Sequence, residues 1–143
     1  MKKEQLIEAL KLMPTNPIGC YFFKATQHGL GLVEEAKKIA KEVWNQKFVY
    51  INTALADVDD MQLQLKLEQA KEMEPTTYCF DEMDKANKEM RSFIFNNLAI
   101  NREKFIHPNS HIIYIVNPDD NEYYQDPWDD YVTLHSTVFN VEA

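Results

Sequence analysis

The chain of 143 residues has few glycines, few cysteines and few arginines. Three glycines leave little material for the glycine-rich loops that wrap around phosphate groups. The two cysteines, Cys20 and Cys79, lie inside apolar runs, so we expect buried, reduced thiols of a cytoplasmic protein rather than a disulfide framework. No apolar run approaches the roughly 20 residues that a membrane-spanning helix needs, and the amphipathic N-terminus does not have the pattern of a signal peptide.

Positive charge is missing from the C-terminal part of the chain. Residues 1–47 contain eight lysines and five acids, whereas residues 48–143 have a net charge of −11. From Phe105 to Ala143 there is no lysine or arginine, against seven aspartates and glutamates. This distribution argues against direct binding of nucleic acid through a basic patch, and against docking on an anionic membrane. It favours a partner protein with a basic surface.

The remaining composition is sufficient for one hydrophobic core. With 45% hydrophobic and 12% aromatic residues, the chain is not disordered, and its length predicts a single domain covering residues 1–143. Short apolar runs alternate with amphipathic stretches, which predicts an α/β fold: a three-layer α/β/α sandwich around a mostly parallel, five-stranded sheet. The predicted helices are 3–13, 30–44, 61–73 and 85–100, and the predicted strands are 18–23, 48–51, 76–80, 111–116 and 132–141.

The segment 61–73 is compatible with two structures. Four apolar residues from Met61 to Leu67 alternate with polar ones, as they do in a half-buried strand. The residues between and after them are good helix formers, however, and Asp59 or Asp60 could cap the start of a helix. We favour the helix.

The sharpest motif is an apolar strand, Thr77–Phe80, that ends in Asp81 and Glu82. This is the Walker B pattern, in which the aspartate holds Mg²⁺ through water and the glutamate orients the attacking water. Both acids would stand at the carboxyl end of a strand, where open α/β sheets bind ligands. On its own the pattern is weak, because any buried strand followed by a polar turn looks similar.

Other segments give this motif a context. An apolar strand at 113–116 ends in Asn117 and a proline, residues 48–52 read FVYIN, and residues 138–143 have the pattern of a closing strand. Together with the two acids, these segments resemble the AAA+ ATPases, and within them the MoxR-like branch. The resemblance begins at about Ile18 and extends to the C-terminus. It implies a P-loop type, AAA+-like sheet.

The resemblance also implies roles for three residues and reveals departures from the family pattern. By resemblance, Asp81 is the metal-binding acid, Glu82 the water-positioning acid and Asn117 the polar sensor. A P-loop needs Gly-x-x-x-x-Gly-Lys-[Ser/Thr], but no Gly-Lys-Ser or Gly-Lys-Thr occurs in the chain, and the loop 24–31 reads KATQHGLG. The arginine that relatives carry before the last strand is missing at 134–137, and we expect no helical lid domain.

These departures predict a degenerate ATPase core. The P-loop lysine and its backbone N–H groups are the main source of phosphate affinity, and an arginine finger alone contributes about 10³–10⁵ in rate. We therefore expect no catalytic residue, no cofactor and no metal ion. Asp81, Glu82 and Asn117 would be vestigial.

A second candidate region, 119–130, contains six acids and three large aromatic residues. It is either a solvated loop with a few anchoring rings or a protein-binding surface, because aromatic residues provide contact area and acids steer a basic partner. A Ca²⁺ loop is less favoured, because the ligand spacing fails and the required glycine is missing. The candidate partner-binding residues are Asp119, Asp120, Glu122, Tyr123, Tyr124, Asp126, Trp128, Asp129 and Asp130.

Three functions follow from these features. The leading hypothesis is a non-enzymatic module that keeps the ATPase shape for protein contact. It would dock as a regulator, adaptor or inhibitor on an active AAA+ subunit, on a client or on a second copy of itself. The first alternative is an acidic, phage-type inhibitor that covers the basic nucleic-acid-binding surface of a partner protein. The second is a weak ATPase that binds nucleotide through an atypical phosphate loop together with Asp81, Glu82 and Asn117.

Overall fold

The computed structural model describes residues 1–13, 19–72, 74–100, 105–117 and 136–143, with the backbone alone at 67–72, 99 and 100. Within these ranges no helix is long and apolar enough to cross a bilayer. The two ends of the chain lie next to each other, because the backbone N–H of Glu142 donates to the carbonyl of Met1 at 2.8 Å.

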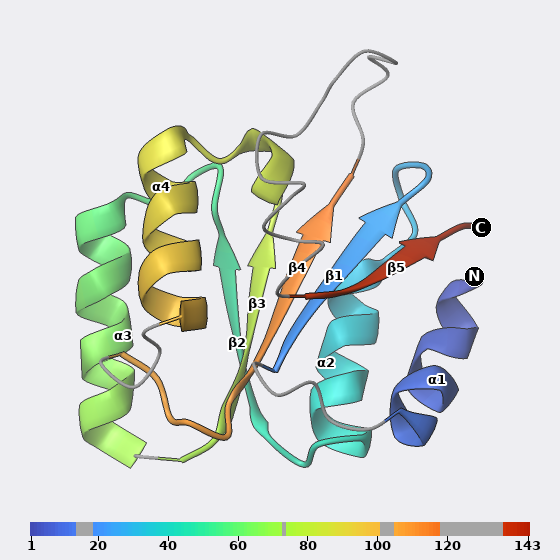
Figure 1. Ribbon diagram of the computed structural model, residues 1–143, viewed down its shortest axis with the longest axis horizontal. Coiled ribbons are helices and arrows are strands. Elements are labelled where there is room, and N and C mark those ends of the chain that lie inside the picture. The colour runs from blue at the N-terminus through green and yellow to red at the C-terminus, as the bar shows by residue number, and fades with distance from the viewer. Residues whose placement is uncertain (14–18, 73, 101–104, 118–135) are drawn as a thin grey trace.

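A five-stranded parallel sheet forms the centre of the molecule (Figure 1). Its strands are β1 (Cys20–Ala25), β2 (Lys47–Asn52), β3 (Thr76–Asp81), β4 (His111–Val116) and β5 (Thr137–Val141). They lie in the order β2-β3-β4-β1-β5, so β2 and β5 are the edges. The inner strands β1, β3 and β4 are almost entirely buried, as apolar strands are when helices cover both faces of a parallel sheet.

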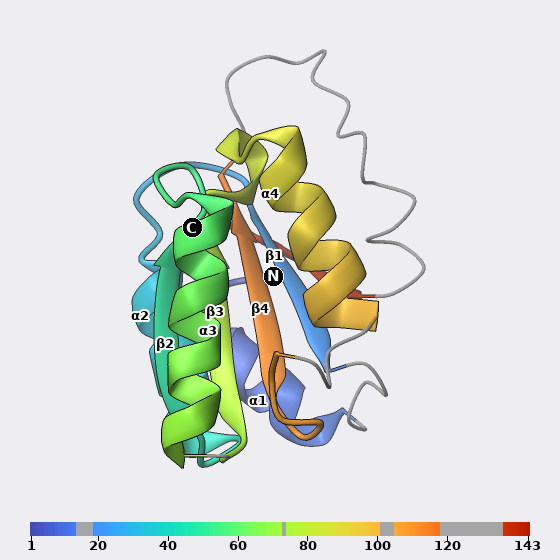
Figure 2. The ribbon, with the colours of Figure 1, turned by 90° about the vertical axis from the view of Figure 1, so that its left-hand side faces the viewer.

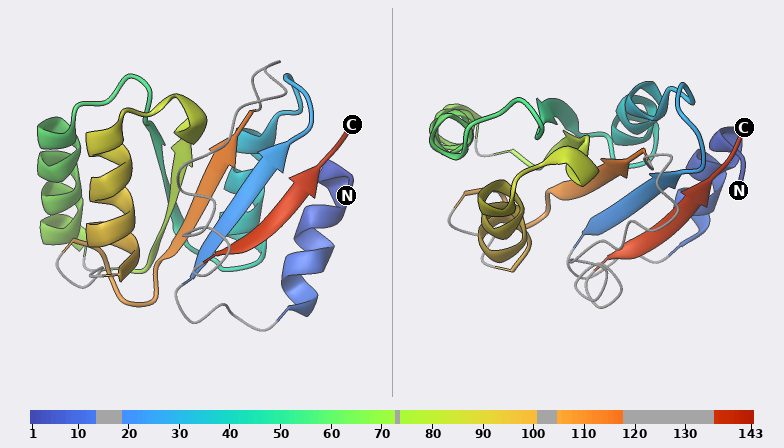
Figure 3. Two further views of the ribbon diagram at one scale, coloured as in Figure 1. Left: turned by 45° about the horizontal axis from the view of Figure 1, so that its top comes forward. Right: turned by 90° about the horizontal axis from the view of Figure 1, so that it is seen from above.

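Helices cover both faces of the sheet. They are η1 (Lys3–Gln5), α1 (Leu6–Leu12), α2 (Leu32–Glu42), α3 (Val58–Glu72), η2 (Met83–Lys85), α4 (Lys88–Phe93) and η3 (Ile94–Ile100). α1 and α2 lie on one face, and α3, α4 and η3 lie on the other (Figure 2, Figure 3). Because the strands are parallel, every strand points its carboxyl end to the same edge of the sheet.

Successive residues of a strand point into two separate apolar cores. Phe22 belongs to the core under α3 and α4, and Phe23 belongs to the core under α1 and α2. In the first core the ring of Tyr114 is the centre, with its centroid 5.4 Å from that of Phe22, 6.0 Å from that of Phe80 and 5.5 Å from that of Phe95. Aromatic packing of this kind makes the sheet a rigid support for the residues at its carboxyl edge.

The structure confirms the predicted α/β/α sandwich and the choice of a helix for the ambiguous segment 61–73. Met61 and Leu65 lie one turn apart on the inner side of α3 and are 1% and 0% exposed, whereas Leu63 is 59% exposed. The alternation of apolar residues therefore results from an apolar residue on the outer side of the helix. It does not indicate a strand.

Several predicted boundaries differ from those of the structure. The predicted helix 85–100 is interrupted, because Asn87 caps a new helix by accepting the backbone N–H of Met90 at 2.8 Å. After α4 the helix continues in the wider π-helical turns of η3. The predicted first strand, 18–23, runs two residues further, to Ala25. The start of the predicted strand 132–141 lies outside the described residues.

Leu65→Ala should lower the free energy of unfolding by about 2–5 kcal/mol, because it leaves a cavity beneath α3. Leu63→Ala, in the same turn of the helix, should change it by no more than about 0.5 kcal/mol, since that side chain is exposed. Urea denaturation of both variants measures the difference. Equal losses in the two variants would contradict the orientation of α3.

Candidate functional site

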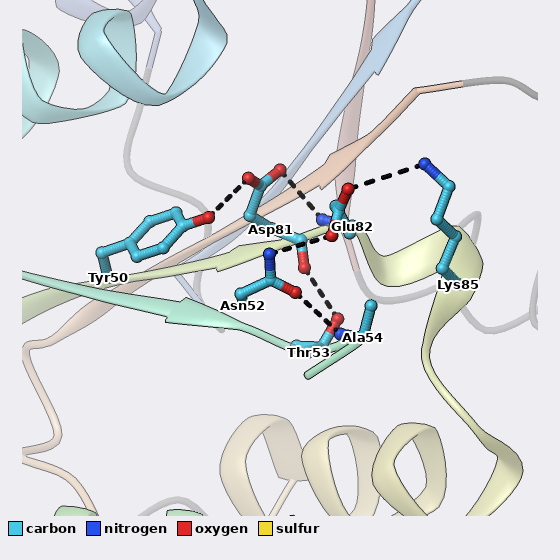
Figure 4. Close-up of polar contacts among 7 residues, drawn as sticks. All are labelled: Tyr50, Asn52, Thr53, Ala54, Asp81, Glu82 and Lys85. Carbon is cyan, nitrogen blue, oxygen red and sulfur yellow. Dashed lines mark hydrogen bonds and ion pairs between the residues drawn. The ribbon is translucent and has the colours of Figure 1, made fainter. Parts of the chain in front are cut away.

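The carboxyl ends of β2 and β3 bring the two predicted acids next to residues of the neighbouring strand. β2 and β3 are paired so that Asn52 lies opposite Asp81. Glu82 follows directly after β3, so both acids lie at the edge where open parallel sheets bind ligands (Figure 4). The pairing of strands thus places the Walker B-like acids where the sequence predicts them.

Both carboxylate oxygens of Asp81 accept hydrogen bonds. Oδ2 accepts from the phenol Oη of Tyr50 at 2.8 Å, and Oδ1 accepts from the backbone N–H of Glu82 at 2.9 Å. The backbone carbonyl of Asp81 accepts twice from Thr53, from its N–H at 3.0 Å and from its Oγ1 at 2.7 Å. Asp81 is therefore fixed at both its side chain and its backbone.

Glu82 is held by one amide and one ammonium. Its Oε2 accepts from Nδ2 of Asn52 at 2.9 Å, and its Oε1 lies 3.6 Å from Nζ of Lys85 (Figure 4). The amide of Asn52 is itself oriented, because its Oδ1 accepts the backbone N–H of Ala54 at 3.0 Å. All four carboxylate oxygens of the acid pair therefore have partners in the chain itself.

The backbone at Glu82 adopts an unusual conformation. Its φ of 56° and ψ of 39° lie in the left-handed region, which non-glycine residues rarely adopt. This turn directs the chain from β3 into η2, where the N–H of Lys85 donates to the carbonyl of Glu82 at 2.9 Å. The turn thus brings Lys85 back toward the acid three residues before it.

Burial and the Asp81 carboxylate change the pKa of two neighbouring groups. The pKa of Tyr50 is raised to about 12, first by burial and then by the hydrogen bond to Asp81 and its negative charge. The pKa of the Cys79 thiol is raised well above its usual range, mainly by burial and further by Asp81. Both groups therefore stay protonated at neutral pH, and Cys79 is not an activated nucleophile.

The loop that would hold phosphate connects β1 to α2. Gly29 and Gly31 have positive φ values of 80° and 70°, and Gly31 stands immediately before α2. In a P-loop the last glycine is followed by lysine and then by serine or threonine. Here the next residues are Leu32 and Val33. Leu32 is 4% exposed and belongs to the apolar core under α1 and α2, so it offers phosphate no charge.

One lysine does reach this loop from elsewhere in the chain. Nζ of Lys3, in η1, lies 3.7 Å from the position that a Cβ atom on Gly31 would occupy. It approaches the loop from the side of the N-terminal helices rather than from the start of α2. The sequence around Gly31 does not indicate this contact, because the two residues are far apart in the chain.

The structure places the third predicted residue, Asn117, directly after β4, which neighbours β3. Asn117 is half-buried at the same edge of the sheet. The described part of the chain contains no group of three or more His, Cys, Asp or Glu side chains arranged to hold a metal ion. Every predicted partner-binding residue lies outside the described residues: Asp119, Asp120, Glu122, Tyr123, Tyr124, Asp126, Trp128, Asp129 and Asp130.

Solved structures of other proteins share this fold. The structure of PCH-2 from C. elegans matches with a TM-score of 0.66 at 15% identity, over 98% of this chain and 42% of that chain. The DnaC helicase loader matches with a TM-score of 0.54 at 10% identity, over 95% of this chain and 86% of that chain. No protein-family model and no curated protein matches the sequence.

Both matched structures are AAA+ ATPase-type proteins. The AAA+-like sheet expected from the sequence is therefore confirmed as a fold. At identities this low the likeness shows the fold alone, and the chain spans less than half the length of PCH-2.

The raised pKa of Tyr50 predicts a loss of stability at alkaline pH. The folded protein holds the phenol proton of Tyr50 more tightly than the unfolded chain does, in which the pKa of this group is 10.0. The contribution of this difference to the free energy of unfolding is complete below about pH 10 and is lost as the pH rises through about 12. Urea denaturation across this range should show a shallower decline for Tyr50→Phe than for the wild type.

Asp81→Asn tests the cause of this shift. Without the negative charge, ultraviolet absorbance should show the phenol of Tyr50 titrating closer to 10 than in the wild type. An unchanged titration in Asp81→Asn would mean that the contact between Tyr50 and Asp81 does not form in solution.

Proposed function

We propose that this chain is a non-catalytic, ATPase-deficient AAA+-like module that acts through protein–protein contact. The observation that carries this proposal is the state of the acid pair: each carboxylate oxygen of Asp81 and Glu82 already has a partner within the chain. A second observation supports it, because Leu32 occupies the place of the P-loop lysine and is buried.

The residues present do not fit a site for Mg²⁺ and a nucleotide. A metal ion held through water would compete with Tyr50 and with the N–H of Glu82 for the oxygens of Asp81. The amide of Asn52 and the ammonium of Lys85 similarly hold Glu82 away from a water molecule. Two carboxylates beside a phosphate loop that lacks its own P-loop lysine would also repel a triphosphate.

A protein partner is the role that remains for an AAA+-like domain of this kind. We propose a regulator, adaptor or inhibitor that docks on an active AAA+ subunit, on a client or on a second copy of itself. The likeness to a helicase loader is consistent with action on another protein. The MoxR-like branch stays a prediction from Asp81-Glu82 and from Asn117 with its following proline.

Titration calorimetry with Mg²⁺-ATP tests the absence of a nucleotide site. The purified protein should give no saturable heat beyond that of MgCl₂ alone, and its Tm should not rise with nucleotide concentration. Saturable binding that Asp81→Ala abolishes would overturn the proposal and would favour the alternative of a weak ATPase.

The position of Lys3 gives that alternative a specific form. If its ammonium replaced the missing lysine of the loop, phosphate would bind between Lys3 and the start of α2 at Gly31. Nucleotide would then raise the Tm of the wild type, and Lys3→Ala would remove the rise. Lys11→Ala is the matched control, because Lys11 pairs with Glu8 on the outer side of α1.

The acidic-inhibitor alternative is separated from the leading proposal by salt and by two sets of variants. Under the leading proposal, a pull-down from the native host should recover an ATPase subunit at both low and high salt. Replacing the aromatic residues by alanine should reduce the amount recovered. An inhibitor of a nucleic-acid-binding protein would instead lose its partner at high salt, and on neutralising the aspartates. The aromatic set is Tyr123, Tyr124 and Trp128, and the acidic set is Asp119, Asp120, Asp126, Asp129 and Asp130.

A further inference from the structure

A hollow of about 360 Å³ lies where α3 and α4 begin. Residues 55–57 of the connection between β2 and α3, together with the first two residues of α3, form one side, and Asn87 and Glu89 at the start of α4 form the other. The two helices run side by side, and both begin at the carboxyl edge of the sheet (Figure 1, Figure 2). Neither Asp81 nor Glu82 lines this hollow, so it is separate from the acid pair.

The residues that line the hollow have a net negative charge. It contains Asp57, Asp59 and Glu89, and no lysine or arginine. The ends of α3 and α4 together offset at most about one charge unit, at roughly half a unit each, which leaves about −2. Within the described part of the chain, the carboxylates of Asp59 and Glu89 have no ion pair. Asp57 uses Oδ1 to accept the N–H of Asp59 at 2.8 Å.

The hollow also has an apolar side. Leu55 is 85% exposed, among the most exposed large apolar side chains of the described residues. Ala56 and Val58 are half-buried and pack against the core under α3 and α4. An exposed leucine beside unpaired acids is the combination that protein interfaces use, because apolar contact gives affinity and the charges select the partner.

We propose that this hollow binds a basic segment of a partner protein in which arginine or lysine stands next to an aliphatic residue. The cationic group would lie between Asp59 and Glu89, and the aliphatic side chain would cover Leu55 and Val58. The volume lies within the roughly 300–1,000 Å³ typical of binding pockets. This inference rests on the proposed function and names the surface and the partner chemistry for it.

Two other occupants fit the hollow less well. An anionic ligand would meet the excess negative charge of its walls. A metal ion would need three or more ligating side chains that converge, and the described residues contain no such group. An arginine or lysine side chain fits both the acidic and the apolar side of the hollow, because a long apolar stem precedes its charged end.

Nuclear magnetic resonance of the ¹⁵N-labelled protein tests the proposal with a capped peptide, Ala-Leu-Arg-Leu-Arg-Ala, and its analogue with glutamine in place of arginine. The arginine peptide should shift the backbone amides of residues 55–59 and 87–89, and the glutamine peptide should not. Asp59→Asn combined with Glu89→Gln should weaken binding about tenfold. Asp60→Asn is the matched control: it lies on the same turn of α3 outside the hollow and should change binding less than about twofold.

Leu55→Ser tests the apolar side against Leu63→Ser, a second exposed leucine that does not line the hollow. Binding should fall severalfold in the first variant alone. Shifts confined to other residues, or an equal loss in Asp60→Asn, would overturn the proposal.

Other outcomes would identify a different occupant. If CaCl₂ alone produced the same shifts, the hollow would be a cation site. If dilution of the protein alone produced them, the occupant would be a second copy of the chain. Nucleotide binding would overturn the proposed function without altering the peptide titration, and failure of the titration would leave the calorimetric result intact.

Discussion

The parallel pairing of β2 with β3 is the interaction on which the carboxyl edge depends. It sets Asn52 opposite Asp81, and two hydrogen bonds from Thr53 to the carbonyl of Asp81 hold that register at its end. Side chains alternate between the faces of a strand, so a slip of one residue would move Asp81 to the opposite face from Tyr50. The polar network of this edge therefore exists in a single register.

This network gives two adjacent carboxylates at one edge of the sheet partners from the chain itself. A buried or half-buried acid is unfavourable when it lacks partners, and each partner found here is a donor or a cation. Tyr50 and Asn52 come from β2, whereas Lys85 comes from the turn after β3. The acids thus connect two strands and a turn.

Much of this arrangement could be predicted from sequence. Alternating apolar runs and amphipathic helices specify the sandwich, and the end of an apolar strand specifies the place of Asp81 and Glu82. The partners of these acids could not be found in the same way, because Tyr50 and Asn52 become neighbours only through strand pairing. The turn at Glu82 was equally hidden, since a glutamate gives no local signal for a left-handed backbone.

The helix boundaries also could not be predicted in full from the sequence. Asn87 is a strong capping residue, but it stands inside a stretch whose periodicity is helical throughout, and the periodicity alone predicts an unbroken helix. In the structure the cap is decisive, because the chain must turn from η2 into α4 at that point. A local hydrogen bond thus sets a boundary that a pattern averaged over many residues does not resolve.

Leu32 has a consequence for how this domain could change over time. A lysine at that position would have to place its ammonium among Leu6, Leu10 and the other apolar side chains of the core, or bend its stem out of it. Such a substitution would destabilise the fold by itself. A P-loop sequence at this position would therefore require further substitutions in the core around residue 32.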